Sequence, residues 1–258
     1  MAEYVERVGL VGGSGAAAGI VFVHGTRVSG AYWHVQLAAL SRQFRTVAVD
    51  LPGHGSRRGE TFSHGEAMDT IRRGIDLCQG SAAVVGHSLG GFLAMDFAAQ
   101  APGKCRGLVL VGCTANARGP SAWPYRAAAR LLPLVPQQWL VRRNEHLLAR
   151  RYSTAVIGPQ MEAGFGFAAL GASWRSVFGT DHASALAAYR GSLLFVNGEH
   201  DWLFRAGEHR FLRASPRSRL LVLSGAGHLC NLDRPVEFTD AVQEFANELE
   251  PTPGSEMA

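Results

Sequence analysis

The sequence predicts an α/β fold in which helices flank a mostly parallel central sheet. Two observations support this fold class. Short apolar runs bounded by turn-forming residues alternate along the chain with longer segments of helical spacing. Runs such as residues 20–23 are continuously apolar, as expected of strands that helices cover on both faces. Ligands of such sheets bind beyond the carboxyl ends of the strands, so polar residues there are the first candidates for function.

The predicted elements follow one another in a regular order. Residues 4–10 are an expected edge strand, and several glycines after them mark turns. Met68, Ile71 and Ile75 recur at helical spacing, and Pro235 stands where a last helix would begin. We expect further strands at residues 20–23, 46–49, 84–85, 108–111, 193–196 and 220–223, and helices at residues 32–40, 66–78, 92–100, 206–213 and 235–249.

This alternation stops between residues 116 and 185. No short apolar strand is recognisable there, prolines interrupt a series of helical segments, and arginines outnumber acidic residues by eight to three. We interpret residues 116–185 as a helical cap inserted into one core formed by residues 1–115 and 186–250. Residues 251–258 are expected to be a disordered tail.

Composition narrows the class of protein. The chain has 258 residues, of which 47% are hydrophobic and 18% charged, as in a globular protein with a large core. No apolar run approaches the roughly 20 residues that cross a bilayer, and residues 1–10 lack a signal pattern, so a cytoplasmic protein without a membrane segment is expected. No basic block resembles a nucleic-acid patch. Nothing in the sequence specifies an oligomeric state.

The four cysteines argue against a disulfide framework and a zinc site. They are widely spaced along the chain and form no C-x-x-C pair, so free thiols are expected. Two of them, Cys113 and Cys230, stand close in sequence to the candidate functional residues described below. We interpret these two as packing residues rather than as redox controls.

The chain is organised around the segment Gly86-His87-Ser88-Leu89-Gly90. It joins a short apolar strand to a helix, and the pattern G-x-S-x-G at such a corner is typical of a nucleophile elbow. The tight turn projects the hydroxyl of Ser88 above the sheet. Gly86 and Gly90 are required because side chains at these positions would collide across the turn.

A serine nucleophile needs a base and an acid that orients the base. The strand at residues 193–196 leads into Asp201, and the strand at residues 220–223 leads into His228. Both loops lie at the same edge of the sheet as Ser88, which gives the chain order expected of this constellation. Glu199 is the alternative acid, but it stands nearer the end of its strand and would need a different turn.

An oxyanion hole needs two donors. The backbone N–H of Leu89, which follows the nucleophile, is one candidate, and that of Thr26, in the loop after residues 20–23, is the other. Gly25 and Arg27 are alternatives to Thr26. Several other polar residues near the strand ends are interpreted as structural, namely His24, which would brace its loop, Asp50, which would cap loop N–H groups, and His54, His87, His200 and His209.

Several of these motifs together resemble the α/β-hydrolase superfamily. They are the segments at 23–25, 50–55, 86–91, 197–201 and 227–228, with Pro235 downstream, and the resemblance covers nearly the whole chain with residues 116–185 as the cap. It implies Ser88 as nucleophile, His228 as base and Asp201 as acid, with no metal and no organic cofactor.

Single residues separate the chain from several relatives within that superfamily. Dehalogenases and epoxide hydrolases of this fold carry Asp at the elbow, where this chain has Ser88. Plant hydroxynitrile lyases carry Lys after the catalytic histidine, where this chain has Leu229. Cofactor-free perhydrolases usually have Met after the nucleophile, where this chain has Leu89.

The sequence therefore predicts a serine hydrolase that cleaves an ester, lactone or thioester of a bulky, largely apolar small molecule. Two alternatives remain open: a carbon–carbon bond hydrolase with the same triad, and a hydrolase-fold receptor with little turnover. Aromatic residues of the cap are expected to line the pocket, and an arginine of the cap to meet an anionic group of the substrate. The aromatic candidates are Trp123, Trp139, Phe165 and Trp174.

Overall fold

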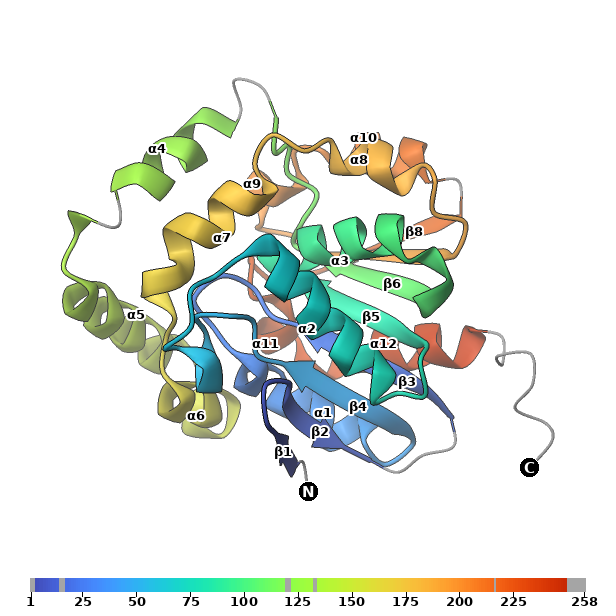
Figure 1. The fold of residues 1–258 in the computed structure, drawn as a ribbon, viewed down its shortest axis with the longest axis horizontal. Helices are drawn as coiled ribbons and strands as arrows, with labels where there is room; N and C mark the ends of the chain where they lie inside the picture. Colours follow the sequence, from blue (N-terminus) through green and yellow to red (C-terminus); the bar gives the residue numbers. More distant parts are fainter. Residues whose placement is uncertain (1–2, 14–16, 119–121, 132–133, 216, 250–258) are drawn as a thin grey trace.

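A computed structural model describes residues 3–13, 17–118, 122–131, 134–215 and 217–249. Within them, eight strands form one sheet in the order β1-β2-β4-β3-β5-β6-β7-β8 (Figure 1). The β1–β2 and β2–β4 pairs are antiparallel and the other five pairs are parallel, which confirms the predicted α/β class. The strands are β1 (Glu3–Val5), β2 (Gly9–Gly12), β3 (Ala17–Val23), β4 (Phe44–Val49), β5 (Ala82–His87), β6 (Cys105–Val111), β7 (Ser192–Gly198) and β8 (Ser218–Leu223).

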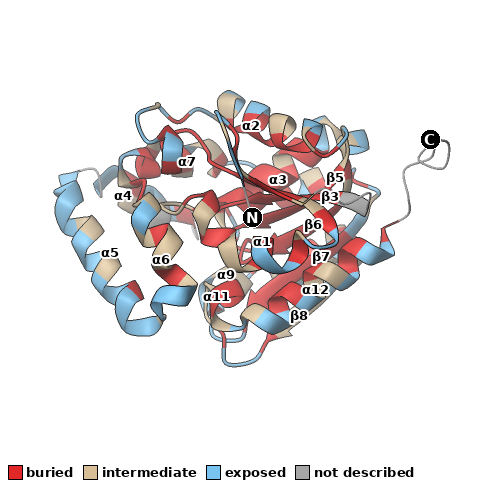
Figure 2. Cartoon of the chain, turned by 90° about the horizontal axis from the view of Figure 1, so that it is seen from below, coloured by how far each residue is buried: buried red, intermediate tan, exposed pale blue. Residues whose placement is uncertain are grey.

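Helices cover both faces of the sheet, and successive residues of each central strand pack on opposite sides. In β3, Val21 and Val23 belong to one buried cluster, while Ile20 and Phe22 belong to the other. The central strands are accordingly coloured as buried in Figure 2. Helices α2 (His64–Asp76), α3 (Leu89–Gln100) and α10 (Glu208–Ala214) supply the first cluster, and α1 (His34–Leu40), α11 (Cys230–Asp233) and α12 (Pro235–Glu248) supply the second.

Most element boundaries differ from the prediction by a few residues, and three differences have a specific physical cause. The expected edge strand at residues 4–10 is a hairpin of β1 and β2, because Arg7 takes a left-handed conformation with φ 58°. The helix expected from residue 32 is preceded by a 3-10 turn, η1 (Gly30–Trp33). Helix α3 begins at Leu89 rather than at residue 92, because close packing outweighs the low helix propensity of the two glycines in its first turn.

The segment between β6 and β7 is helical, as predicted, and lies to one side of the sheet (Figure 1). Its helices are α4 (Trp123–Leu131), α5 (Gln137–Arg151), α6 (Thr154–Ala163), η6 (Phe167–Ala169), α7 (Leu170–Val177) and α8 (His182–Leu186). Helix α8 differs from the others because it packs on α3 and α10 of the core. We therefore propose that the inserted cap ends after α7. The predicted disordered tail, residues 251–258, lies outside the described residues.

Two negative findings hold for the part of the chain that the structure describes. No helix in it combines the length and the apolar character needed to cross a bilayer. The four cysteines are all free and buried, which confirms the prediction of free thiols.

The corner between β5 and α3 is packed against neighbouring backbone. Ser88 takes φ 53° and ψ −115°, a conformation that non-glycine residues rarely adopt. A Cβ atom at Gly86 would lie 2.4 Å from the carbonyl oxygen of Gly90, and one at Gly90 would lie 2.2 Å from that of Val23. Both distances are far below van der Waals contact with backbone atoms. The predicted collision across the turn is confirmed for Gly86, whereas at Gly90 the obstacle is the backbone of the neighbouring strand β3.

Replacing Gly90 by alanine is therefore expected to destabilise the protein. Gly90→Ala should lower the free energy of unfolding by about 1–3 kcal/mol, the usual cost of overpacking, because the new methyl group meets a backbone carbonyl that has no room to move. Gly65→Ala is the matched control, since Gly65 lies in α2 with open space around its Cβ position. It should be neutral or raise stability by up to about 1 kcal/mol. Denaturant titration measures both, and equal stability of the two variants would contradict the packing argument.

Candidate active site

Three loops at the carboxyl edge of the sheet carry the candidate catalytic residues. Ser88 follows β5, Asp201 follows β7 and His228 follows β8. Nδ1 of His228 lies 2.7 Å from Oδ2 of Asp201. Ser88 and His228 line the same cavity, and the Asp201 side chain is buried behind the histidine. The arrangement can therefore serve a hydroxyl nucleophile, an imidazole base and a carboxylate that orients the imidazole.

The alternative acid, Glu199, is engaged elsewhere. Its Oε2 accepts hydrogen bonds from Oγ of Ser224 at 3.0 Å and from the backbone N–H of Gly225 at 2.8 Å, on the exposed surface. The structure thus pairs His228 with Asp201, the residue preferred on sequence grounds.

Two neighbours confine the His228 ring from its sides. The ring of Phe204, in α9 (Trp202–Arg205), stacks on it with centroids 4.1 Å apart and an angle of 22° between the planes. Behind it, a Cβ atom at Gly112 would lie 3.0 Å from Nδ1 of the histidine, so a larger residue would crowd the ring. Stacking and lack of space together restrict the imidazole to few orientations.

His87 supports the loop that carries the base. Its Nε2 donates to the backbone carbonyl of His228 at 2.9 Å, and its ring stacks on Tyr32 with centroids 5.3 Å apart. Burial, together with the neighbouring His228, holds the pKa of His87 well below its ordinary value. His87 is therefore a neutral donor at physiological pH. It supports a loop, as predicted, but it also lines the cavity, where the prediction had it pointing elsewhere.

The loop after β3 is braced by a second buried histidine. His24 Nδ1 donates to the carbonyl of Gly25 at 2.8 Å, and Nε2 accepts from the N–H of Leu51 at 3.0 Å. Burial lowers the pKa of His24 to about 4 and that of His54 to about 3, so both rings stay neutral. The predicted bracing role of His24 is confirmed.

Asp50 also behaves as predicted. Its Oδ1 accepts from the backbone N–H of Gly30 at 2.7 Å, and its Oδ2 accepts from the N–H and the hydroxyl of Ser56 at 3.0 and 2.7 Å. It therefore fixes the turn after β4 rather than facing the cavity.

Asp233 is a structural residue that the sequence reasoning missed. Its carboxylate accepts from the backbone N–H of Gly227 at 2.7 Å, one residue before the candidate base. It also forms a bidentate ion pair with Arg151 of α5 at 2.7 Å and accepts from the hydroxyl of Tyr152 at 2.7 Å. No local pattern marks this residue, because Arg151 and Tyr152, its side-chain partners, lie about 80 residues before it in the sequence.

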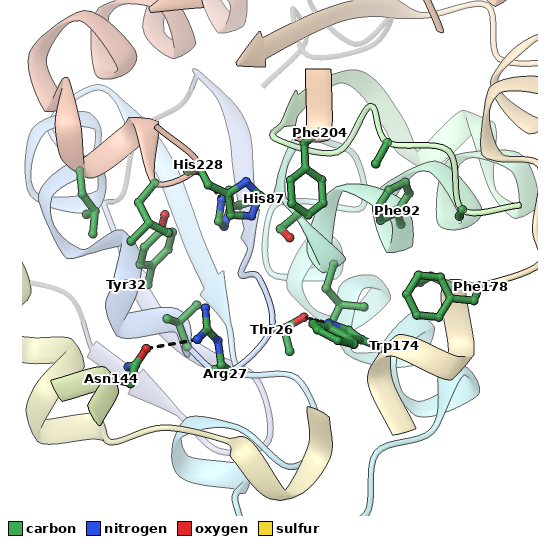
Figure 3. Close-up of a pocket in the computed structure, with 18 of the residues that line it drawn as sticks. Thr26, Arg27, Tyr32, His87, Phe92, Asn144, Trp174, Phe178, Phe204 and His228 are labelled. Atoms are coloured by element: carbon green, nitrogen blue, oxygen red, sulfur yellow. Dashed lines mark hydrogen bonds between the residues drawn. The ribbon is translucent and has the colours of Figure 1, made fainter. Parts of the chain in front are cut away.

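The cavity beside Ser88 has a volume of about 280 Å³ and a mostly apolar wall. Trp174 of α7 lines it, as predicted, and its Nε1 donates to Oγ1 of Thr26 at 2.9 Å. Phe178 also belongs to the cap aromatics from which pocket residues were expected, whereas the sequence reasoning missed the other three aromatic side chains of the wall. They are Tyr32, Phe92 and Phe204, labelled with Phe178 in Figure 3.

The prediction of pocket residues is wrong at three positions. The cavity wall in the described structure does not include Trp123, Trp139 or Phe165. Trp123 and Trp139 are 70% and 54% exposed on the outer faces of α4 and α5, and Phe165 is buried in the core cluster that contains α1 and α12. An aromatic residue in a helix reveals neither which face it occupies nor which neighbour that face meets.

The prediction that an arginine of the cap faces the pocket is also wrong. The arginine that lines the cavity is Arg27, from the loop after β3, and none of the lining residues is an arginine of residues 116–185. Arg27 entered the prediction only as an alternative backbone donor for the oxyanion hole. Its side chain had no signal of its own in the sequence, since arginine is common throughout the chain.

The two cysteines near the site are buried packing residues. Cys113 and Cys230 are completely buried, and burial raises the pKa of both. Among the described residues, no group of three or more His, Cys, Asp or Glu side chains is placed to hold a metal ion.

Comparison with known proteins extends these observations. Residues 20–241 match the model of the alpha/beta hydrolase family. The chain is 28% identical over 235 residues to a pimeloyl-[acyl-carrier protein] methyl ester esterase of Nitrosomonas europaea, covering 85% of this chain and 92% of that one.

Two solved structures resemble the fold. A hydrolase from Pseudomonas aeruginosa PA01 has a TM-score of 0.75 at 22% identity and covers 95% of this chain and 97% of its own. An enol-lactonase from Burkholderia xenovorans has a TM-score of 0.74 at 22% identity and covers 96% and 100%.

The pairing of His228 with Asp201 can be tested by substitution. Asp201→Asn should lower kcat of ester hydrolysis by about 10⁴-fold, because an amide no longer holds the imidazole in the tautomer that accepts a proton. Glu199→Gln, two residues away on the surface, is the matched control and should change kcat less than about threefold. Steady-state kinetics on an aryl ester distinguishes the two acids, and a larger loss in the Glu199 variant would reverse the assignment.

Proposed function

Because the chain belongs to the alpha/beta hydrolase family and is an esterase-like hydrolase, we propose that it cleaves carboxylic esters of bulky, largely apolar small molecules through Ser88, His228 and Asp201. The observation that carries this proposal is that Ser88 and His228 open into one apolar cavity, with the buried Asp201 hydrogen-bonded to the far side of the imidazole. Lactones and thioesters belong to the same proposed class.

In the proposed reaction, Oγ of Ser88 attacks the ester carbonyl while Nε2 of His228 takes the hydroxyl proton. Asp201 holds Nδ1–H and stabilises the imidazolium. The tetrahedral intermediate collapses to an acyl-enzyme as His228 gives its proton to the departing alcohol. A water molecule, deprotonated by His228, then releases the acid and regenerates Ser88.

The negative charge of the intermediate is assigned to the backbone N–H groups of Leu89 and Thr26. Leu89 is the first residue of α3, so its N–H lies at the positive end of the helix dipole. The hydrogen bond from Trp174 engages the side chain of Thr26 and leaves its backbone N–H for the substrate. His24 supports the same loop from behind.

The size and polarity of the cavity support an apolar substrate of moderate bulk. Phe92, Trp174, Phe178 and Phe204 contribute aromatic surface to its wall. Burial of apolar area contributes binding energy in proportion to that area, so larger acyl or aryl groups should bind more tightly. The curated relative is named for the cleavage of a methyl ester, which supports an ester as the scissile bond.

The triad can be tested by removing its nucleophile. Ser88→Ala should lower kcat by about 10⁴–10⁶-fold and leave the fold intact, since the triad acts as one unit. Melting temperature, measured beside kcat, controls for folding. Near-full activity in a folded Ser88→Ala protein would refute the enzyme mechanism, and covalent labelling of the wild type without turnover would instead favour a receptor.

The substrate class can be tested with esters of increasing size. Values of kcat/KM for p-nitrophenyl acetate, butyrate and octanoate should rise with chain length by at most about fourfold per buried methylene. Trp174→Ala should flatten this rise because it removes part of the apolar wall. Trp139→Ala, on the exposed face of α5, is the control and should leave the rise unchanged. Fastest hydrolysis of acetate, with the same ranking in both variants, would contradict a bulky apolar substrate.

A further inference from the structure

Arg27 occupies an unusual position beside the candidate active site. It directly follows Thr26 in the loop after β3 and takes a left-handed backbone conformation with φ 78°. Its side chain lines the cavity, and Figure 3 shows the guanidinium group turned into the cavity toward Asn144 of α5. A strained backbone at a residue whose side chain enters a pocket is a feature that functional sites share.

Among the described residues, this guanidinium group has no countercharge. No ion pair in the described part of the chain includes Arg27, and the described residues of the cavity wall contain no Asp or Glu. Its contacts are a long hydrogen bond of 3.3 Å from Nη1 to Oδ1 of Asn144 and the ring of Phe167, whose centroid lies 5.7 Å from Cζ.

Keeping an arginine charged in such surroundings costs free energy unless an anion pairs with it. Burial lowers the pKa of Arg27, which reports the loss of water around the charge. Removing a charged group from water is compensated only by pairing and hydrogen bonding, and one amide oxygen at 3.3 Å supplies little of either. Most N–H groups of the guanidinium are thus left for a partner that the protein itself does not provide.

We propose that Arg27 binds a carboxylate group of the substrate, so that the natural substrate carries an ester and a free acid on the same molecule. This inference rests on the proposed esterase function. A planar carboxylate matches the forked guanidinium by two parallel hydrogen bonds. A single carboxylate is favoured over a phosphate because Arg27 is the only lysine or arginine among the described lining residues, and a dianion would keep one charge unpaired.

The position of Arg27 also limits where the acid lies on the substrate. Thr26, its neighbour in the chain, is the proposed donor to the carbonyl oxygen, so the carboxylate and the scissile carbonyl are separated by a short linker. In Figure 3, Arg27 and Asn144 lie on one side of the cavity, and Phe92, Trp174 and Phe178 lie on the other. The apolar part of the substrate would therefore extend toward the aromatic side, away from the acid.

The test compares matched pairs of esters in which one member carries a free carboxylate and the other carries the methyl ester of that carboxylate. The first pair, p-nitrophenyl hydrogen adipate and p-nitrophenyl methyl adipate, places the charge on the acyl side. The second pair, 4-acetoxybenzoate and its methyl ester, places it on the leaving group. At pH 7 the wild type should prefer the acid over the neutral ester in at least one pair by about tenfold or more in kcat/KM, as expected of a charge-assisted hydrogen bond.

Substitutions assign this preference to the guanidinium. Arg27→Met should lower the acid-to-neutral ratio by about tenfold or more, mainly through KM, and Arg27→Lys should retain an intermediate ratio because it keeps the charge without the fork. Methionine carries the same backbone penalty at this φ as arginine, so the loop conformation is not relieved. Arg143→Met is the matched control: Arg143 is exposed on α5 over the ring of Trp139, outside the cavity, and its variant should keep the wild-type ratio.

Two results would overturn the inference while leaving the esterase function in place. The first is Ser88-dependent hydrolysis by the wild type with no preference for the acid in either pair. The second is an Arg27→Met variant that slows both members of each pair equally, which would make Arg27 a structural tether between its loop and α5. Absence of Ser88-dependent hydrolysis of any ester would remove the proposed function and this inference with it.

Discussion

The close approach of the β5–α3 corner to strand β3 is the contact on which the rest of the site depends. Gly90 lies against the carbonyl of Val23, with no space for a side chain between them. This contact fixes the height of Ser88 relative to the loop that begins one residue after Val23. Two backbones in direct contact therefore set the distances between the nucleophile, the two proposed oxyanion donors and Arg27. Flexible side chains do not determine these distances.

Much of the fold and the three candidate catalytic residues could be predicted because their signals are local. A buried strand followed by a turn is visible in a few residues, and Ser88, Asp201 and His228 each stand in the loop or turn that follows such a strand. The aromatic wall of the cavity could not be predicted, because Trp139 and Trp174 occupy similar helical segments and differ only in the face that meets the core. The role proposed for the Arg27 side chain was missed for a related reason. Whether an arginine has a countercharge depends on its neighbours in the folded structure, which the sequence does not show.

The site uses histidine in two different ways. His24 and His87 are buried, their pKa values are lowered by burial, and each fixes a loop as a neutral ring with defined donor and acceptor nitrogens. His87 and His228 both line the cavity, but of the three only His228 is hydrogen-bonded to a carboxylate, that of Asp201. The neutral rings add no positive charge behind Ser88, which would otherwise weaken the proton affinity of the base and compete with Arg27 for an anion.

The carboxylate of Asp233 connects the inserted helical segment to the loop that carries His228. It holds the backbone beside His228 on one side and Arg151, at the end of α5, on the other. Any displacement of α5 would act on the same carboxylate that holds the backbone beside His228. The position of this helix and the geometry of the base loop are therefore coupled through one side chain, although they lie about 80 residues apart in the sequence.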